Sequence, residues 1–206
     1  MNKVKGLMFL AGIIFLATAN AETDYSNETL AVKRMFAKKE IVALSEEFVG
    51  VVSKAGKQAG LFPVKSTGVS TQPVVAAAIE FLGTLSLEQK IRTQFSVDDP
   101  EWRKWSNIDN GIYVRQGLSF EEMASEQKKV AWKLLPASLS VQGINLSKRI
   151  MKTDQTLKEL NNDDLSYGEE KYFMTIMGIP SETEPWGWQL DGHHLIINYF
   201  VLGDQV

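Results

Sequence analysis

The stretch Trp186-Gly187-Trp188-Gln189-Leu190-Asp191-Gly192-His193-His194-Leu195 decides the fold prediction for this chain of 206 residues. Two segments with strand-like patterns, Trp186–Leu190 and His193–Leu202, are separated by Asp191-Gly192. Asp-Gly between alternating segments is typical of a two-residue hairpin turn, because such a turn needs positive φ at both central positions. We therefore predict an antiparallel hairpin that turns at Asp191-Gly192.

This turn fixes the register, and side chains alternate between the two faces of a strand. Leu190 would then pair with His193, and Gln189 with His194. One face is apolar and should pack against helices; it holds Trp186, Trp188, Leu190, His193, Leu195, Ile197 and Tyr199. The other face has a polar stripe beside Gly187, which would leave open space over Gln189; the stripe holds Gln189, His194 and Asn198.

The chain before the hairpin is predicted to be mainly helical. Apolar residues at helical spacing predict a long helix over residues 28–57, with Gly56 and Gly60 marking its end. Pro73 favours the start of another helix, because proline suits the first helical turn. The core face of that helix would consist of Val75, Ile79, Phe81 and Leu82.

Two further helix starts are predicted by one signal. Ser86-Leu-Glu-Gln89 and Ser119-Phe-Glu-Glu122 both fit a capping box, in which two side chains satisfy free backbone N–H groups. The second of these helices should run over residues 120–135, and Pro136 should kink or restart it. A last helix is expected over residues 144–160.

The order of these elements predicts an α+β fold. A helical N-terminal two-thirds should pack on a C-terminal antiparallel hairpin or meander. Between the capped helices, residues 98–105 are polar and aromatic, which predicts a loop with a short helical turn. We expect one globular domain over residues 22–206.

The first 21 residues have the three parts of a secretory signal peptide. Lys3 and Lys5 precede the uncharged apolar run Gly6–Thr18, and Ala19-Asn20-Ala21 offers small residues at the cleavage site. The apolar run is shorter than the roughly 20 residues that span a bilayer. We therefore expect cleavage before Glu22, export to the periplasm or the extracellular space, and no stable membrane span afterwards.

Composition excludes several functions. The formal charge of −3 becomes about −5 without Lys3 and Lys5, which gives no electrostatic footprint for nucleic acid. The chain has no cysteine, which removes thiol catalysis and thiolate metal sites. Its two histidines are adjacent, so any imidazole chemistry must come from His193 or His194.

Two kinds of site on the hairpin stay open. A small molecule could lie over its aromatic and polar residues, which are Trp186, Trp188, Gln189, His194 and Asn198. A divalent metal could bind Asp191, His193 and His194. Adjacent histidines on a strand point apart, so both could bind one ion only where the strand breaks, and a third ligand such as Glu184 would be needed. Alternatively, the polar residues are merely solvated.

These sites correspond to two hypotheses about function. The first is an exported protein that binds a small ligand over the hairpin. The second is an exported metal-dependent hydrolase or other enzyme, with His193 or His194 as metal ligand or general base. Trp102 and Trp105, in a charged loop, are the tryptophans expected to be exposed, whereas Trp132 is expected in the core.

The hairpin motif also resembles a known family. The run Glu184–Leu195, followed by Asn198 and Gly203–Val206, is similar to the closing motif of a bacterial family named domain-of-unknown-function family 3500. The upstream segments that agree are Phe81–Gln89, Trp102, Trp105, Asn107, Leu118–Met123, Ser138–Ser140 and Gly143. The resemblance implies export and a unit over about residues 81–206, and it implies no catalytic residue because no activity is established for the family.

The chain departs from the family at two places. Pro136 falls where relatives have an uninterrupted helix. Relatives also continue beyond the stretch that ends at Val206, and Gln205-Val206 resembles the start of a returning strand. We therefore expect this chain to be a fragment of a longer protein, since a strand without its partner would leave an exposed apolar edge.

Overall fold

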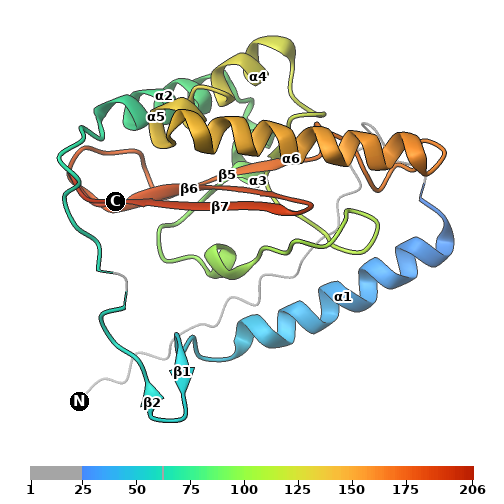
Figure 1. Cartoon of the computed structure of the whole chain (residues 1–206), viewed down its shortest axis with the longest axis horizontal. Helices are drawn as coiled ribbons and strands as arrows, with labels where there is room; N and C mark the ends of the chain where they lie inside the picture. The colour runs from blue at the N-terminus through green and yellow to red at the C-terminus, as the bar shows by residue number, and fades with distance from the viewer. Residues whose placement is uncertain (1–24, 62) are drawn as a thin grey trace, which may run out of the picture.

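The computed structural model describes residues 25–61 and 63–206, so the predicted signal peptide lies outside the described residues. The α+β prediction is confirmed: helices cover one face of a mixed five-stranded sheet (Figure 1). The strands are β3 (Gln94–Phe95), β4 (Leu118–Ser119), β5 (Phe173–Met177), β6 (Trp186–Gly192) and β7 (Leu195–Val201). Their order is β3-β5-β6-β7, and β4 pairs with β5 as well.

The predicted hairpin exists, but its turn lies later in the chain than predicted. Gly192 at the end of β6 pairs with Leu195 at the start of β7, so His193 and His194 form the turn. The predicted turn at Asp191-Gly192 and the register derived from it are wrong. The strand residues keep their predicted faces, because moving a turn by two residues preserves the alternation of side chains.

The packing of Gly192 explains where the turn lies. A Cβ at this position would collide with the ring of Tyr172, so the glycine permits close packing within the strand. The positive φ in the turn belongs to His194, at 60°. The tertiary contact with Tyr172 therefore overrides the local preference of Asp-Gly for a turn.

The apolar face of the hairpin packs against helices, as predicted. Trp186 and Trp188 are fully buried, and Trp188 Nε1 donates a hydrogen bond to Ser138 Oγ at 3.1 Å. The helices on this side are α2 (Gln72–Thr84), α4 (Ser125–Ala131), α5 (Leu134–Ser138) and α6 (Val141–Leu160). Among the described residues, no helix is long and apolar enough to cross a membrane.

The opposite face of the sheet is covered by residues 96–117, which include the predicted helical turn as η1 (Pro100–Arg103). Gly187 makes room for the ring of Trp102, with which a Cβ at that position would collide. The predicted open space over Gln189 is therefore wrong, and every residue of β6 is buried.

The first helix is shorter than predicted. α1 (Asn27–Ser45) ends where the chain becomes extended at Glu46, and a small hairpin of β1 (Val52–Ser53) and β2 (Gly56–Lys57) follows. The predicted helix over 28–57 and its end at Gly56 and Gly60 are wrong. No residue of α1 is buried, so its apolar side chains do not form a core face.

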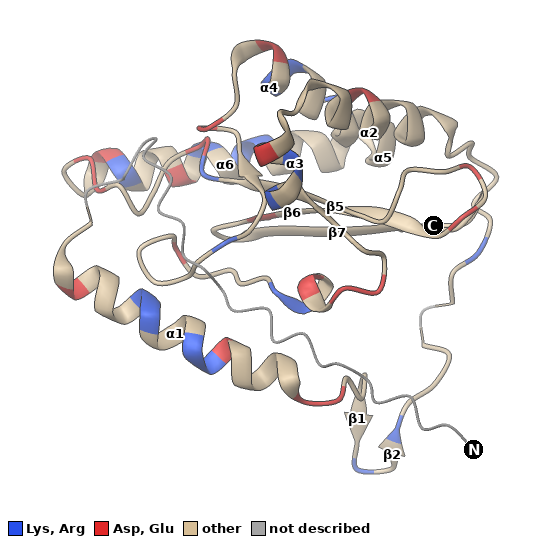
Figure 2. Ribbon diagram, turned by 180° about the vertical axis from the view of Figure 1, so that it is seen from behind, with Lys and Arg blue, Asp and Glu red and all other residues tan. Residues whose placement is uncertain are grey.

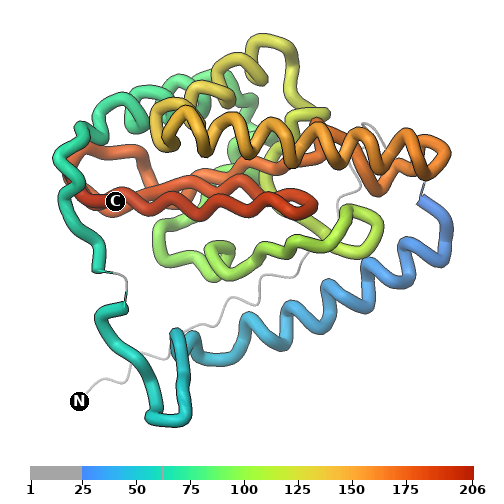
Figure 3. The backbone as a smooth tube through the Cα atoms, viewed as in Figure 1, coloured from blue at the N-terminus to red at the C-terminus, as the bar shows by residue number. Residues whose placement is uncertain are grey.

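Polar contacts attach α1 to the covering segment, beside which it runs (Figure 3). The guanidinium of Arg103 donates to the main-chain oxygens of Ala43 and Glu46, each at 3.1 Å. These bonds satisfy carbonyl groups at the C-terminal end of the helix. Tyr113 also donates a hydrogen bond to the carboxylate of Glu40.

The helices over the sheet begin largely as predicted. Pro73 lies in the first turn of α2, but Ile79 is exposed, so its predicted place in the core is wrong. The capping box of Ser86 and Gln89 is present at the start of α3 (Leu87–Thr93). α6 covers the predicted helix 144–160 and begins three residues earlier, at Val141.

The second predicted capping box does not start a helix. Ser119 N donates to Glu122 Oε2 at 3.0 Å, and Glu122 N donates back to Ser119 Oγ at 3.2 Å. Ser119 belongs to β4, however, and pairing with β5 holds it in a strand. The continuous helix predicted over 120–135 is therefore wrong; α4 and α5 replace it, and Pro136 lies inside α5.

Candidate functional site

The turn between β6 and β7 brings the two histidines against α6. Asp154, on the buried face of α6, lies with Oδ1 at 2.5 Å from Nδ1 of His193. The other carboxylate oxygen accepts a hydrogen bond from the N–H of Gly168 at 2.9 Å. Both residues of the pair are buried, and the Tyr172 hydroxyl donates to the His193 carbonyl at 2.9 Å. These bonds fix the position of the imidazole.

Two aromatic rings hold the His193 imidazole in one orientation. The His194 ring stacks on it at 3.9 Å, and the Tyr167 ring lies at 5.6 Å with an angle of 42°. His194 is exposed, and its backbone N–H donates to the Asn107 carbonyl. Among the described residues no hydrogen bond reaches His193 Nε2. A histidine whose Nδ1 faces a carboxylate while Nε2 is free can accept a proton or bind a metal.

Asp191 has a separate partner on the covered face of the sheet. Its carboxylate lies 3.3 Å from Nε of Arg115, whose side chain is fully buried. Burial raises the pKa of Asp191 to about 6, although the Arg115 charge and a hydrogen bond from Ser106 N oppose this rise. The Arg115 Nη atoms donate to Asn110 Oδ1 and to the main-chain oxygens of the same segment. The pair ties the covering segment to β6.

The residues proposed from sequence for ligand binding are dispersed. Trp186 and Trp188 lie in the core, and Gln189 is buried, where it donates to Asn198 Oδ1 at 2.6 Å. Asn198 and His194 are exposed. No shared surface is formed by these five residues, because the helices and the covering segment take the two faces of the sheet.

The three residues proposed for a metal also have different surroundings. Asp191 faces Arg115, whereas His193 faces Asp154, and only the two histidine rings lie together. Within residues 25–61 and 63–206, no group of three or more His, Asp or Glu side chains is arranged to hold a metal ion.

Asp154 and Arg115 were not predicted from the sequence as residues of the site. Asp154 follows Ser147 and Met151 at helical spacing, and all three are buried, so the pattern of α6 could have placed it on the core face. Arg115 lies in a segment without periodic pattern, and nothing in the sequence connects it with Asp191.

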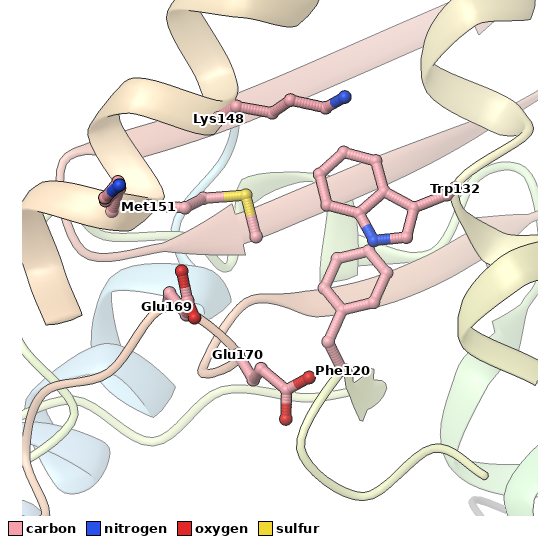
Figure 4. A pocket seen from close by; sticks show the side chains of 7 residues that line it. Phe120, Trp132, Lys148, Met151, Glu169 and Glu170 are labelled. Atoms are coloured by element: carbon pink, nitrogen blue, oxygen red, sulfur yellow. The ribbon is translucent and has the colours of Figure 1, made fainter. Parts of the chain in front are cut away.

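A hollow of about 340 Å³ lies between α6 and the chain before β5 (Figure 4). Its apolar wall consists of Met151 and two aromatic rings, Phe120 and Trp132, which stack at 5.1 Å and 19°. Trp132 is only partly buried, so it packs against the core as predicted and also lines this hollow. The rim carries charged side chains of both signs: Lys148, Lys152, Glu169 and Glu170.

Comparisons with known proteins identify the family of the chain but no individual protein that resembles it. No curated protein and no solved structure matches the chain. A family model described as "Protein of unknown function (DUF3500)" matches residues 67–206, which include all the strands of the main sheet and helices α2 to α6. The match confirms the resemblance of the hairpin motif and extends it to the start of α2. The chain therefore belongs to the DUF3500 family.

Proposed function

We propose that the domain binds a small ligand with a flat ring and charged groups, in the hollow lined by Phe120, Trp132 and Met151. The observation that carries this proposal is the partly exposed Trp132 ring inside a concave, charged rim. Ligand sites are typically concave and mostly apolar, with a few polar groups that orient the ligand. This site replaces the predicted one over the hairpin, whose aromatic residues are buried.

The charges on the rim indicate the chemistry of the ligand. Lys148 and Lys152 come from α6, and Lys148 Nζ lies 5.6 Å from the centre of the Trp132 ring. Glu170 already pairs with Lys128 at 2.6 Å, whereas Glu169 has no ion pair among the described residues. A ligand with a ring, an ammonium and a carboxylate, such as an aromatic amino acid, would match the wall and both signs of charge.

Calorimetric titration of the purified protein tests this proposal with four probes: L-phenylalanine, phenethylamine, phenylacetate and glucose. Phenylalanine should bind most tightly, with an affinity about two- to fivefold above that of the two single-charge compounds. The difference is small because each rim charge is exposed to solvent and contributes little binding free energy. Trp132→Leu should abolish binding, and Trp105→Leu, an exposed tryptophan outside the hollow, should not. Binding that survives Trp132→Leu, or no heat with any probe, would refute the proposal. Binding of glucose alone would show a sugar site instead.

A second candidate is an exported enzyme in which His193 is a general base. It is favoured by the buried Asp154–His193 hydrogen bond and by the free Nε2. Hydrolysis of 4-nitrophenyl acetate is a suitable first assay. The rate should fall in both His193→Gln and Asp154→Asn and stay unchanged in Thr153→Ala, an exposed change on α6; equal rates in all four proteins would rule it out. Metal analysis tests the metal-dependent version, which requires stoichiometric metal that is lost in both His193→Ala and His194→Ala.

Export is proposed from the sequence of residues 1–21. The charged start, the apolar run and the Ala19-Asn20-Ala21 site support cleavage before Glu22 and a periplasmic or extracellular location. N-terminal sequencing of the protein expressed in a bacterial host tests this. A mature protein that begins at Glu22 outside the cytoplasm is the expected result, and an intact N-terminus in the cytoplasm would contradict it.

A further inference from the structure

We propose that a second hollow, between α1 and the segment before β4, binds a small carboxylate through Lys33. This hollow has a volume of about 260 Å³ and is separate from the Trp132 hollow. Figure 2 shows basic residues along α1, which forms one side. The residues that the argument uses are Tyr25, Lys33, Tyr113, Arg115, Lys171 and Phe173.

Four cations line this hollow, and three of them already have a carboxylate. Arg115 faces Asp191, Lys171 Nζ lies 2.8 Å from Glu121 Oε2, and Arg92 Nη2 lies 3.0 Å from Glu122 Oε1. Lys33 makes no ion pair within residues 25–61 and 63–206; its Nζ lies 4.4 Å from the centre of the Tyr25 ring. One positive charge therefore has no counter-ion among the residues that line the hollow, and a single anionic group would supply it.

Burial makes this charge unfavourable in the empty hollow. The pKa of Lys33 is lowered to about 8 by burial first and then by the charges of Arg115 and Lys171, while Asp109 opposes the effect. An oxyanion beside Lys33 would stabilise the ammonium and offset its repulsion from Arg115 and Lys171.

The walls favour a carboxylate with a small apolar part. The Tyr25, Tyr113 and Phe173 rings and Val114 line the hollow. The Tyr113 hydroxyl is bonded to Glu40, and the Tyr25 hydroxyl donates to the Leu165 carbonyl, so neither is free to donate to a ligand. A phosphate dianion would need more free hydrogen-bond donors and a second cation without a counter-ion in the hollow. A monoanion such as butyrate has one negative charge for Lys33 and a short apolar chain for the walls.

Binding of a carboxylate should be linked to the protonation of Lys33. The charges that act on Lys33 are those of Arg115, Lys171 and Asp109. The other titratable or charged side chains that line the hollow are Arg92, Glu121, Glu122 and the phenols of Tyr25 and Tyr113. Because the anion stabilises the charged ammonium, affinity is highest well below pH 8 and falls as the pH rises through 8. At about pH 8, binding should therefore take up a fraction of a proton, roughly half.

The test is calorimetric titration of butyrate into the protein, at about pH 7 and at about pH 9.5, where affinity should fall by roughly tenfold. Lys33→Met should abolish binding, whereas Lys38→Met, an exposed lysine on the same helix, should not. Because Lys33 is only half-buried and α1 has no fully buried residue, both variants should keep the fold, and circular dichroism checks this. Titrations near pH 8 in two buffers of different ionisation heat measure the proton uptake.

Three results would overturn the proposal. Absence of butyrate binding by the folded protein, or equal binding by Lys33→Met, removes Lys33 as the ligand-binding group. Binding of inorganic phosphate without butyrate would show a different class of anion. Trp132→Leu separates the two hollows: it should leave butyrate binding intact, whereas Lys33→Met should leave phenylalanine binding intact.

Discussion

The carboxylate of Asp154 and the imidazole of His193 share a hydrogen bond of 2.5 Å, although 39 residues separate them in the chain. The bond connects the middle of α6 with the tip of the β6–β7 hairpin. It also explains why a histidine can occupy the turn: the side chain is held from the helix side while the backbone reverses.

Loss of this bond should destabilise the fold. In Asp154→Asn, the amide oxygen can still accept from the Gly168 N–H, but the NH2 group that then faces His193 Nδ1 can only donate, which requires the other imidazole tautomer and loses the bond to a carboxylate. We expect the free energy of unfolding in urea to fall by about 1–3 kcal/mol. Thr153→Ala, an exposed change on the same helix, should stay within about 0.5 kcal/mol of the wild type. Equal stability of both variants would show that the bond contributes nothing to stability.

Gly192 and Gly83 should respond in opposite directions to alanine. Gly192→Ala places a methyl group in the Tyr172 ring and should cost at least about 1–3 kcal/mol, since the packed strand cannot move away easily. Gly83 lies in α2 with nothing near its Cβ position, so Gly83→Ala should stabilise the helix by up to about 1 kcal/mol. Thermal unfolding of the two variants measures the direction of each change in stability. A Gly192→Ala variant as stable as the wild type would contradict the packing argument.

Stability should fall as the pH rises from about 4.5 to about 7. Burial raises the pKa of Glu101 to about 7 and that of Asp191 to about 6, above their ordinary values of 4.5 and 3.8. The folded state then holds more protons than the unfolded state across this window, so a rise in pH favours unfolding. Stability from these groups is full below their ordinary pKa values and is lost as they ionise.

Glu101→Gln tests this pH dependence. The variant should have a flatter stability profile and, at about pH 8, a free energy of unfolding roughly 1–3 kcal/mol above the wild type. Some slope should remain because Asp191 still titrates. Glu182→Gln, in an exposed loop, is the matched control and should keep the wild-type profile. An unchanged slope in Glu101→Gln would contradict the assignment.

Arg103→Ala should loosen α1 without unfolding the sheet. It leaves the carbonyls of Ala43 and Glu46 without their donor, and no buried apolar residue compensates. Chymotrypsin should cut within α1 roughly severalfold faster, because local opening costs less free energy. Residues 67–206 should persist as a stable fragment. The exposed Arg149→Ala serves as control, and unchanged cleavage of α1 in Arg103→Ala would argue against the polar attachment.

The fold class could be predicted because the signals for it are local. Alternation from Trp186 onward marked both strands of the hairpin, and the capping box at Ser86 marked the start of α3. The turn was misplaced because the small size of Gly192 serves packing against Tyr172, a contact between residues far apart in sequence. Such contacts are not encoded in the pattern of neighbouring residues.

The candidate sites were harder to predict for the same reason. The Trp132 hollow depends on Phe120, which was expected inside a helix but follows β4. The spacing of apolar residues such as Met35 and Ile41 indicated a helix, yet both side chains are exposed, because periodicity predicts the helix and does not show what packs against it. The Asp191–Arg115 pair joins a strand to an irregular segment, for which the sequence has no periodic signal.

The strand order also has a consequence for how the sheet assembles. β5, β6 and β7 are consecutive in the chain and form neighbouring antiparallel pairs, so their ends meet through short connections. β3 instead reaches β5 only after closure of a loop of about 80 residues, which costs more chain entropy than either hairpin. The three C-terminal strands can therefore come together early, and the parallel edge joins once the intervening helices have folded against them.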